Sequence, residues 1–196
     1  MTPSAAPMIL LYARVGRQAA MRGRPIAATG WFTAGYLMVW AGFAFVAAAA
    51  QSVLEQLALL DPMLASSSAV FGGMVLIVAG VYQWTPLKNA CLSLCQSPVV
   101  FMQRYGGFRP ESLDSLTVGA RHGAYCVGCC WALMGLLFVG GVMNVLWIAA
   151  ISIAVLAEKL VPTGRLIPRV TGVALIGAGA WVLVMALGWG SLPTSH

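Results

Sequence analysis

Charged side chains are absent from long stretches of this chain, and this absence most constrains its fold. Residues Thr29–Leu54 contain no Asp, Glu, Lys or Arg, and neither do the 35 residues Gly123–Ala157. Only 8% of all residues are charged and 60% are hydrophobic, whereas soluble domains average about 25% charged and about 45–50% apolar. So few charges cannot cover a soluble surface. The pattern excludes a soluble enzyme, a disordered chain and a disulfide-rich miniprotein, and predicts an all-α polytopic membrane bundle.

The apolar stretches divide into about five transmembrane helices, because each span needs about 20 mostly apolar residues. The charge-free stretch 123–157 is too long for one span, since about 52 Å of helix would exceed a hydrocarbon core of about 30 Å. Two helices joined at Gly140-Gly141 fit that stretch better. The predicted spans lie near residues 30–50, 69–87, 117–139, 142–157 and 170–188.

The few charges also predict an orientation. Residues 1–28 hold four arginines, whereas residues 51–68 hold two acids and no base. With five spans, every basic segment falls on one side, which the positive-inside rule makes the cytoplasmic side. We therefore expect a multi-pass membrane protein with a cytoplasmic N-terminus, a basic interfacial segment over residues 1–28 and a single transmembrane domain over residues 29–190. The net charge of +6 then reflects this orientation, and no nucleic-acid partner is expected.

All five cysteines lie in two clusters, each at the predicted cytoplasmic membrane boundary. The clusters are Cys91-x3-Cys95 and His122-x3-Cys126-x2-Cys129-Cys130. Helical residues at i, i+3 and i+4 share a face, so the histidine and the three later cysteines fall within an arc of about 100°. The first two cysteines are also i, i+4 partners if their segment is helical.

Such a set of sulfur and imidazole groups is typical of a site for a soft metal ion. Thiolates select Cu(I), Zn(II) or Hg(II), and thioethers favour Cu(I). We therefore predict Cu(I), with Zn(II) and Hg(II) as alternatives. A disulfide is disfavoured on the reducing cytoplasmic side. The candidate ligands are Cys91, Cys95, Cys126, Cys129, Cys130 and His122, with Met134, Met143 and Glu158 as additional candidates.

Several motifs in the middle of the chain resemble a known bacterial family. They are Y-Q-W-T-P-L-K at 82–88, the two cysteines that follow it, H-G-x-Y-C-x-G-C-C-W at 122–131, G-x-M-N at 141–144, and E-K at 158–159. The family has no known function, and its members are described as predicted metal-binding integral membrane proteins. The resemblance covers residues 81–159 and implies a metal-binding membrane protein, without naming the metal or the task.

Three functions remain open at this point. The first is metal handling, meaning delivery, sequestration or passage of the ion. The second is a non-enzymatic accessory subunit of a membrane complex, which would bind a membrane-protein partner or a second copy of the chain. The third is a membrane thiol oxidoreductase built on a pair such as Cys126-x2-Cys129. No Ser-His-Asp or paired-carboxylate pattern is visible, so no catalytic residue is predicted and a hydrolytic enzyme is not expected. The amide of Asn144 is expected to hydrogen-bond to a neighbouring helix.

Overall fold

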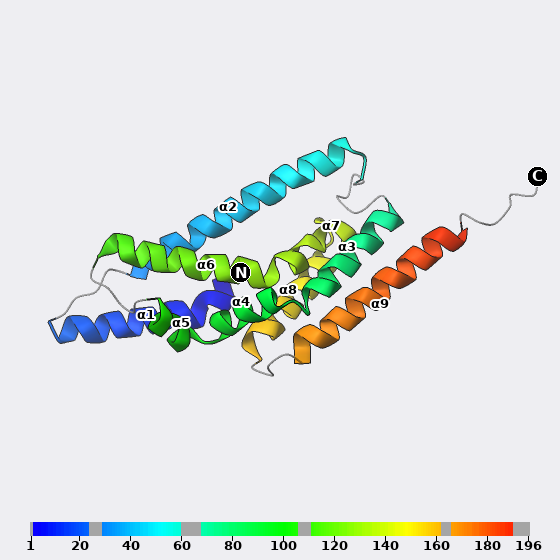
Figure 1. The fold of residues 1–196 in the computed structure, drawn as a ribbon. Coiled ribbons are helices and arrows are strands. Elements are labelled where there is room, and N and C mark those ends of the chain that lie inside the picture. Colours follow the sequence, from blue (N-terminus) through cyan, green and yellow to red (C-terminus); the bar gives the residue numbers. More distant parts are fainter. Residues whose placement is uncertain (1, 24–28, 60–67, 106–110, 162–165, 190–196) are drawn as a thin grey trace, which may run out of the picture. The chain divides into compact units, whose positions relative to one another are not determined.

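A computed structural model describes residues 2–23, 29–59, 68–105, 111–161 and 166–189 (Figure 1). Throughout these ranges the regular elements are α-helices, which confirms the predicted all-α fold. The helices are α1 (Thr2–Met21), α2 (Thr29–Gln56), α3 (Ala69–Tyr82), α4 (Pro86–Gln96), α5 (Pro98–Arg104), α6 (Ser112–Gly135), α7 (Leu137–Gly140), α8 (Val145–Leu160) and α9 (Leu166–Trp189).

Some of these helices are long and apolar enough to cross a membrane. In the described ranges, three spans qualify: α2, the stretch Ser112–Gly140 formed by α6 and α7, and residues Leu166–Leu187 of α9. A fourth is reached if α3 and α4 count as one span that bends by 66°. Helix α8 has 16 residues and is shorter than a usual span. The predicted number of about five spans therefore depends on α8 as well.

The second predicted span ends earlier than expected. The apolar pattern predicts a helix up to residue 87, but α3 ends at Tyr82 and a new helix starts at Pro86. Proline has no backbone N–H, and its ring disfavours a helical conformation in the residue before it. The first position of a helix tolerates proline because the N–H there has no intrahelical partner. Pro86 therefore begins α4 instead of extending α3.

The chain divides into two compact units, each made of two separate stretches of sequence. The first unit contains Met1–Ala47 and Ala90–Cys129, and the second contains Ala48–Asn89 and Cys130–His196. Each unit has its own packed helices and is described separately below.

In the first unit, glycines bring the backbones of α2 and α6 into direct contact. A Cβ atom at Gly119 would overlap the carbonyl oxygen of Phe32, and one at Gly123 would lie 3.1 Å from the carbonyl oxygen of Tyr36. Small residues allow this close approach of helices. Residue numbers rise together along the two helices, so α2 and α6 run parallel at this crossing.

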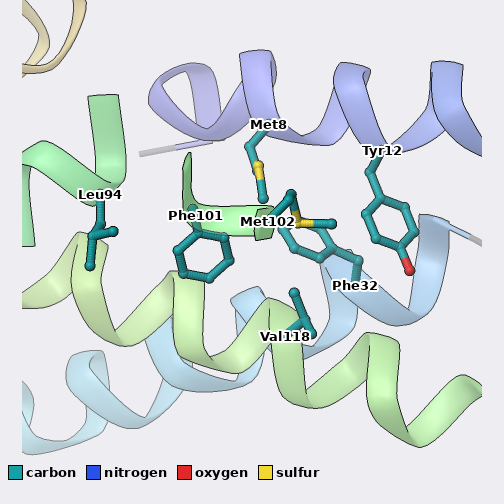
Figure 2. Packing of buried hydrophobic residues seen from close by; sticks show 7 residues of the cluster. All are labelled: Met8, Tyr12, Phe32, Leu94, Phe101, Met102 and Val118. Carbon is teal, nitrogen blue, oxygen red and sulfur yellow. The ribbon is translucent and has the colours of Figure 1, made fainter. Parts of the chain in front are cut away.

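Helix α1 packs against the first unit through one face. Ala5, Met8 and Tyr12 are buried, while Arg14 and Arg17 are exposed. The Tyr12 hydroxyl hydrogen-bonds to the Ser115 hydroxyl of α6. Figure 2 shows the cluster of buried side chains beneath α1, which consists of Met8, Tyr12, Phe32, Leu94, Phe101, Met102 and Val118. The N-terminal basic segment is therefore an amphipathic helix with a protein-facing side.

In the second unit, α3 and α9 lie side by side in extended contact (Figure 1). A Cβ atom at Gly80 would lie 2.9 Å from the carbonyl oxygen of Gly172, and one at Gly179 would lie 2.7 Å from that of Gly73. The glycines are seven residues apart on each helix, so they face the partner helix every second turn. Residue numbers fall along α9 as they rise along α3, so these two helices are antiparallel.

The chain turns between α7 and α8, next to the glycine pair at which the sequence analysis expects a hairpin. Gly141 has a φ of +88°, a conformation that residues with a Cβ atom rarely adopt. The Asn144 side chain accepts a hydrogen bond from the backbone N–H of Trp147 at 3.2 Å and caps α8. The expectation that Asn144 bonds to another helix is therefore wrong, because the orphan N–H groups of its own helix lie closer.

Replacing Gly80 with alanine should destabilise the protein. The added Cβ atom would meet the Gly172 carbonyl at 2.9 Å and the Ile176 backbone nitrogen at 3.0 Å, and such overpacking costs about 1–3 kcal/mol. The matched control is Gly177→Ala on α9, where a Cβ atom would meet nothing within 4 Å. That control should be neutral or slightly stabilising, because alanine favours helix. Thermal unfolding in detergent would compare them, and equal melting temperatures would contradict the α3–α9 contact.

Candidate metal centre

Helix α6 supplies the central groups of the candidate site. His122, Cys126 and Cys129 follow one another at i, i+4 and i+7, so they stay on one face. Their side chains are 1%, 1% and 2% exposed. Asp114 lies in the first turn of this helix. Its negative charge stabilises the helix start because it interacts favourably with the positive end of the helix dipole. The predicted helical face therefore exists and points into the protein.

Helix α4 brings a third thiol to that face. The Cys95 sulfur lies 3.5 Å from the Cys126 sulfur and 4.0 Å from the Cys129 sulfur. A metal ion that binds sulfur at about 2.3 Å in a tetrahedral site separates its sulfur ligands by about 3.8 Å. The two separations from Cys95 thus match those of thiolates that share one ion. Cys95 thus approaches two cysteines that lie 31 and 34 positions later in the chain.

Cys91 lies one helical turn before Cys95 and is 7% exposed. A Cβ atom at Gly128 would lie 3.0 Å from its sulfur. Glycine at this position therefore leaves room for the Cys91 side chain against the backbone of α6. In this way the two cysteines of α4 both face α6, as the i, i+4 spacing predicts.

Aromatic rings lie close to His122. Its ring centroid lies 5.0 Å from that of Phe101 and 6.0 Å from those of Phe32 and Tyr36. The Nε2 atom is 3.9 Å from the Cys126 sulfur, and the buried Nδ1 atom has no hydrogen-bond partner among the described residues. A buried polar atom without a partner is costly. Nε2, the nitrogen nearer the thiols, is therefore the atom placed to share an ion with Cys126, and the orphaned Nδ1 is not explained by that ion. This aromatic enclosure was not predicted from the sequence. The three aromatic residues are far from His122 along the chain, so their presence alone did not indicate that they would meet it.

The remaining predicted ligands on α6 and beyond belong to the second unit. Cys130 follows Cys129 directly on α6 and is 1% exposed. Met134 is half-buried one turn further along the same helix. Met143 is 63% exposed in the turn before α8. These three residues remain predictions as ligands.

Glu158 forms an ion pair that the sequence analysis did not foresee. Its Oε2 atom lies 2.6 Å from the Nζ atom of Lys88, and the two side chains are 2% and 1% exposed. Lys88 also donates a hydrogen bond to the Gln83 side chain. The predicted role of Glu158 near a metal remains a prediction, but its carboxylate neutralises a buried lysine 70 positions away. The sequence signal was a lone lysine and a lone acid, each at the end of an apolar stretch.

All five cysteines are present as thiols. Within the described ranges, no three His, Cys, Asp or Glu side chains are arranged to hold a metal ion as they stand. The thiol pairs that meet at Cys95, together with the buried imidazole, form a sulfur-rich set without a competing carboxylate. This donor set suits a soft monovalent or divalent cation, and it does not suit Mg²⁺ or Ca²⁺, which require oxygen ligands.

Comparison with known proteins connects this chain with copper. Residues 1–182 match the model of the PpoB2 family, which is described as a copper chaperone. This chain belongs to the PpoB2 copper chaperone family. No curated protein and no solved structure matches it. Membership of a copper chaperone family supports the predicted copper-related role, and it agrees with the metal-binding character that the resemblance implied.

Replacing Glu158 with glutamine should destabilise the second unit strongly. The change leaves Lys88 buried without a counter-charge, which costs about 3–5 kcal/mol. The matched control is Glu111→Gln, because Glu111 is exposed before α6. Thermal unfolding in detergent should show a large fall for the first variant and almost none for the second. A double variant Lys88→Met/Glu158→Met should recover most of the loss, and failure of this rescue would argue against the ion pair.

Proposed function

We propose that this chain is an integral membrane copper chaperone that binds Cu(I) through the thiols of Cys95, Cys126 and Cys129. The observation that carries the proposal is the convergence of the Cys95 sulfur on the other two, at 3.5 and 4.0 Å. His122, 3.9 Å from the Cys126 sulfur, is the proposed imidazole ligand. Cys91 and Cys130 are proposed as further thiol ligands.

The chemistry of the site favours Cu(I) among the soft ions. Cu(I) prefers thiolate and thioether ligands, and family membership connects the chain with copper. The thiols of Cys126 and Cys129 are almost completely buried, which keeps bulk water from the ion. Met134 and Met143 are proposed as additional thioether ligands, and Glu158 as a carboxylate on the entry path of the ion. Zn(II) and Hg(II) remain the competing ions in any binding assay.

In this proposal copper is cargo and moves by ligand exchange. Each thiol that becomes a thiolate ligand releases one proton, so loading depends on pH. A thiolate or thioether of an acceptor protein would then displace the ligands one at a time, and each displaced thiolate regains a proton. Copper keeps its oxidation state throughout, so neither an oxidant nor a reductant is required. The acceptor is a proposed protein partner.

We infer a membrane topology from the directions of the packed helices. Because α2 and α6 run parallel, an odd number of crossings must separate them, and the bent pair α3–α4 supplies one. Because α3 and α9 run antiparallel, an even number must separate them, which requires that both α6 and α8 cross. Five spans result. The basic segments then fall on the cytoplasmic side with the N-terminus, in a bacterial inner membrane.

A reporter protein fused after His196 should be periplasmic, because five spans put the two termini on opposite sides. A reporter inserted after residue 23 should be cytoplasmic. Paired enzymatic reporters that are active on one side only would measure both positions. A cytoplasmic C-terminus would contradict the five-span topology and would leave α8 outside the membrane.

Removing two of the converging thiols should abolish copper binding. We expect the variant Cys126→Ser/Cys129→Ser to lose most of the Cu(I) that the wild type retains, and the affinity should fall by at least about 100-fold because thiolate ligands are lost. The control is Ser93→Ala, which removes an exposed hydroxyl, bonded to the Ala90 carbonyl, from α4, the helix that carries Cys95. Metal analysis of purified protein and competition with a Cu(I) chelator would measure the change. Copper retained equally by wild type and double variant would contradict the site.

A thiol oxidoreductase is the second candidate, and the 3.5 Å approach of the Cys95 and Cys126 sulfurs favours it. In that case an external disulfide would oxidise the two thiols to one disulfide and take up two electrons and two protons. Thiol alkylation after treatment with oxidised glutathione would distinguish the functions. Reversible loss of two thiols in protein that binds no copper would favour the oxidoreductase.

A further inference from the structure

The second unit contains a polar cavity that the copper chemistry does not use. Its volume is about 470 Å³, and it lies where the end of α3 meets the starts of α4 and α9. The lining residues are Gln83, Trp84, Asn89, Arg169 and Val173. The lining thus combines a cation, two amides and two apolar side chains, and it contains no acid.

The walls of the cavity are held together by specific contacts. The indole nitrogen of Trp84 donates a hydrogen bond to the carbonyl oxygen of Arg169 at 3.3 Å. A Cβ atom at Gly172 would lie 2.8 Å from that indole nitrogen and 3.0 Å from the Cβ atom of Gln83. Glycine therefore lets α9 approach the bend after α3. The cavity is thus formed by fixed contacts between the bend and the first turns of α9.

Two donor groups in this cavity lack acceptors. Gln83 is 1% exposed. Its side-chain oxygen accepts from Lys88, but its Nε2 atom has no hydrogen-bond partner among the described residues. Arg169 is exposed and forms no ion pair with the described residues. Lys88 is already neutralised by Glu158. An anion with several acceptor oxygens would supply acceptors for both groups.

A phosphate group meets this requirement. Its oxygens accept two parallel hydrogen bonds from a guanidinium, and one further oxygen can accept from a buried amide. The apolar surface beside the cavity indicates the source of that phosphate. Val170 and Val173 on α9 are 61% and 60% exposed, and Trp84 is 50% exposed. Tryptophan at this level is typical of the membrane interface, and basic pockets between membrane helices bind lipid headgroups.

We propose that this cavity binds the phosphate of an anionic phospholipid. Arg169 and the Gln83 amide hold the headgroup oxygens, and the acyl chains follow the exposed valines of α9. Such a lipid would connect the bend after α3 to α9 and would stabilise the second unit. The proposal is independent of copper binding.

Lipid binding to the purified full-length protein tests the site. Thermal unfolding and native mass spectrometry would be recorded in detergent with phosphatidylglycerol, phosphatidylcholine or inorganic phosphate. We expect phosphatidylglycerol to raise the melting temperature and to remain bound, and phosphatidylcholine to do neither. Arg169→Gln should weaken phosphatidylglycerol binding by about tenfold or more, because a charge-assisted hydrogen-bonded pair is lost. Phosphatidylglycerol binding by Arg169→Lys should lie between that of the wild type and that of Arg169→Gln, because lysine keeps the charge but cannot form two parallel hydrogen bonds.

The matched control is Arg17→Gln, which removes an exposed arginine from α1 in the first unit. This control should bind phosphatidylglycerol like the wild type. Unchanged binding by Arg169→Gln, or equal binding of phosphatidylcholine, would overturn the proposal. If inorganic phosphate alone raised the melting temperature as much as phosphatidylglycerol does, a lipid would not be the source of the bound phosphate. Copper content is measured in parallel and should be unchanged in Arg169→Gln. A failure of the lipid proposal is thereby distinguished from a failure of the copper proposal.

Discussion

Close contact between helix backbones is the interaction on which the rest of this structure depends. Helices in lipid gain little from burying apolar side chains against each other, because the lipid is equally apolar. Their association relies on packing at short range, which glycine permits. Gly119 and Gly123 bring α6 onto α2, and Gly80 and Gly172 bring α3 onto α9. These contacts also determine which helices run parallel and which run antiparallel.

The candidate metal centre follows from the same kind of contact. Gly128 leaves space for the Cys91 sulfur, so α4 can lie close enough to α6 for Cys95 to reach Cys126 and Cys129. A bulkier residue at position 128 would move α4 outward and separate the thiols. The site is therefore a property of two helices packed at short distance, and each helix alone carries only part of the ligand set.

Much of this arrangement could be predicted from the sequence, because it depends on local patterns. Charge-free stretches indicated the helices, the Gly140-Gly141 pair indicated a turn, and the i, i+4 spacing of Cys91 and Cys95 indicated a shared face. Both cysteine clusters were also expected at one membrane boundary, which is compatible with the pairing of α4 and α6. Which thiols meet was not predictable, since the spacing leaves five candidates equivalent.

Features that depend on distant partners were missed. The ion pair between Lys88 and Glu158 joins residues 70 positions apart, and no local period encodes it. The early end of α3 depends on Pro86, a single residue that interrupts a continuous apolar stretch. The enclosure of His122 depends on rings from α2 and α5, which only the fold brings near. Local sequence patterns thus predict the helices, whereas contacts between distant residues depend on how the helices pack.

The interleaved composition of the two units has a consequence for biogenesis. All helices of the first unit have been synthesised once Cys129 leaves the ribosome, whereas α3 of the second unit must wait for α9 at the far end of the chain. Until then Gly73 and Gly80 lack their packing partners on α9. The helices that carry Cys95, Cys126 and Cys129 can therefore assemble during synthesis, while the second unit can assemble only after α9 has been synthesised.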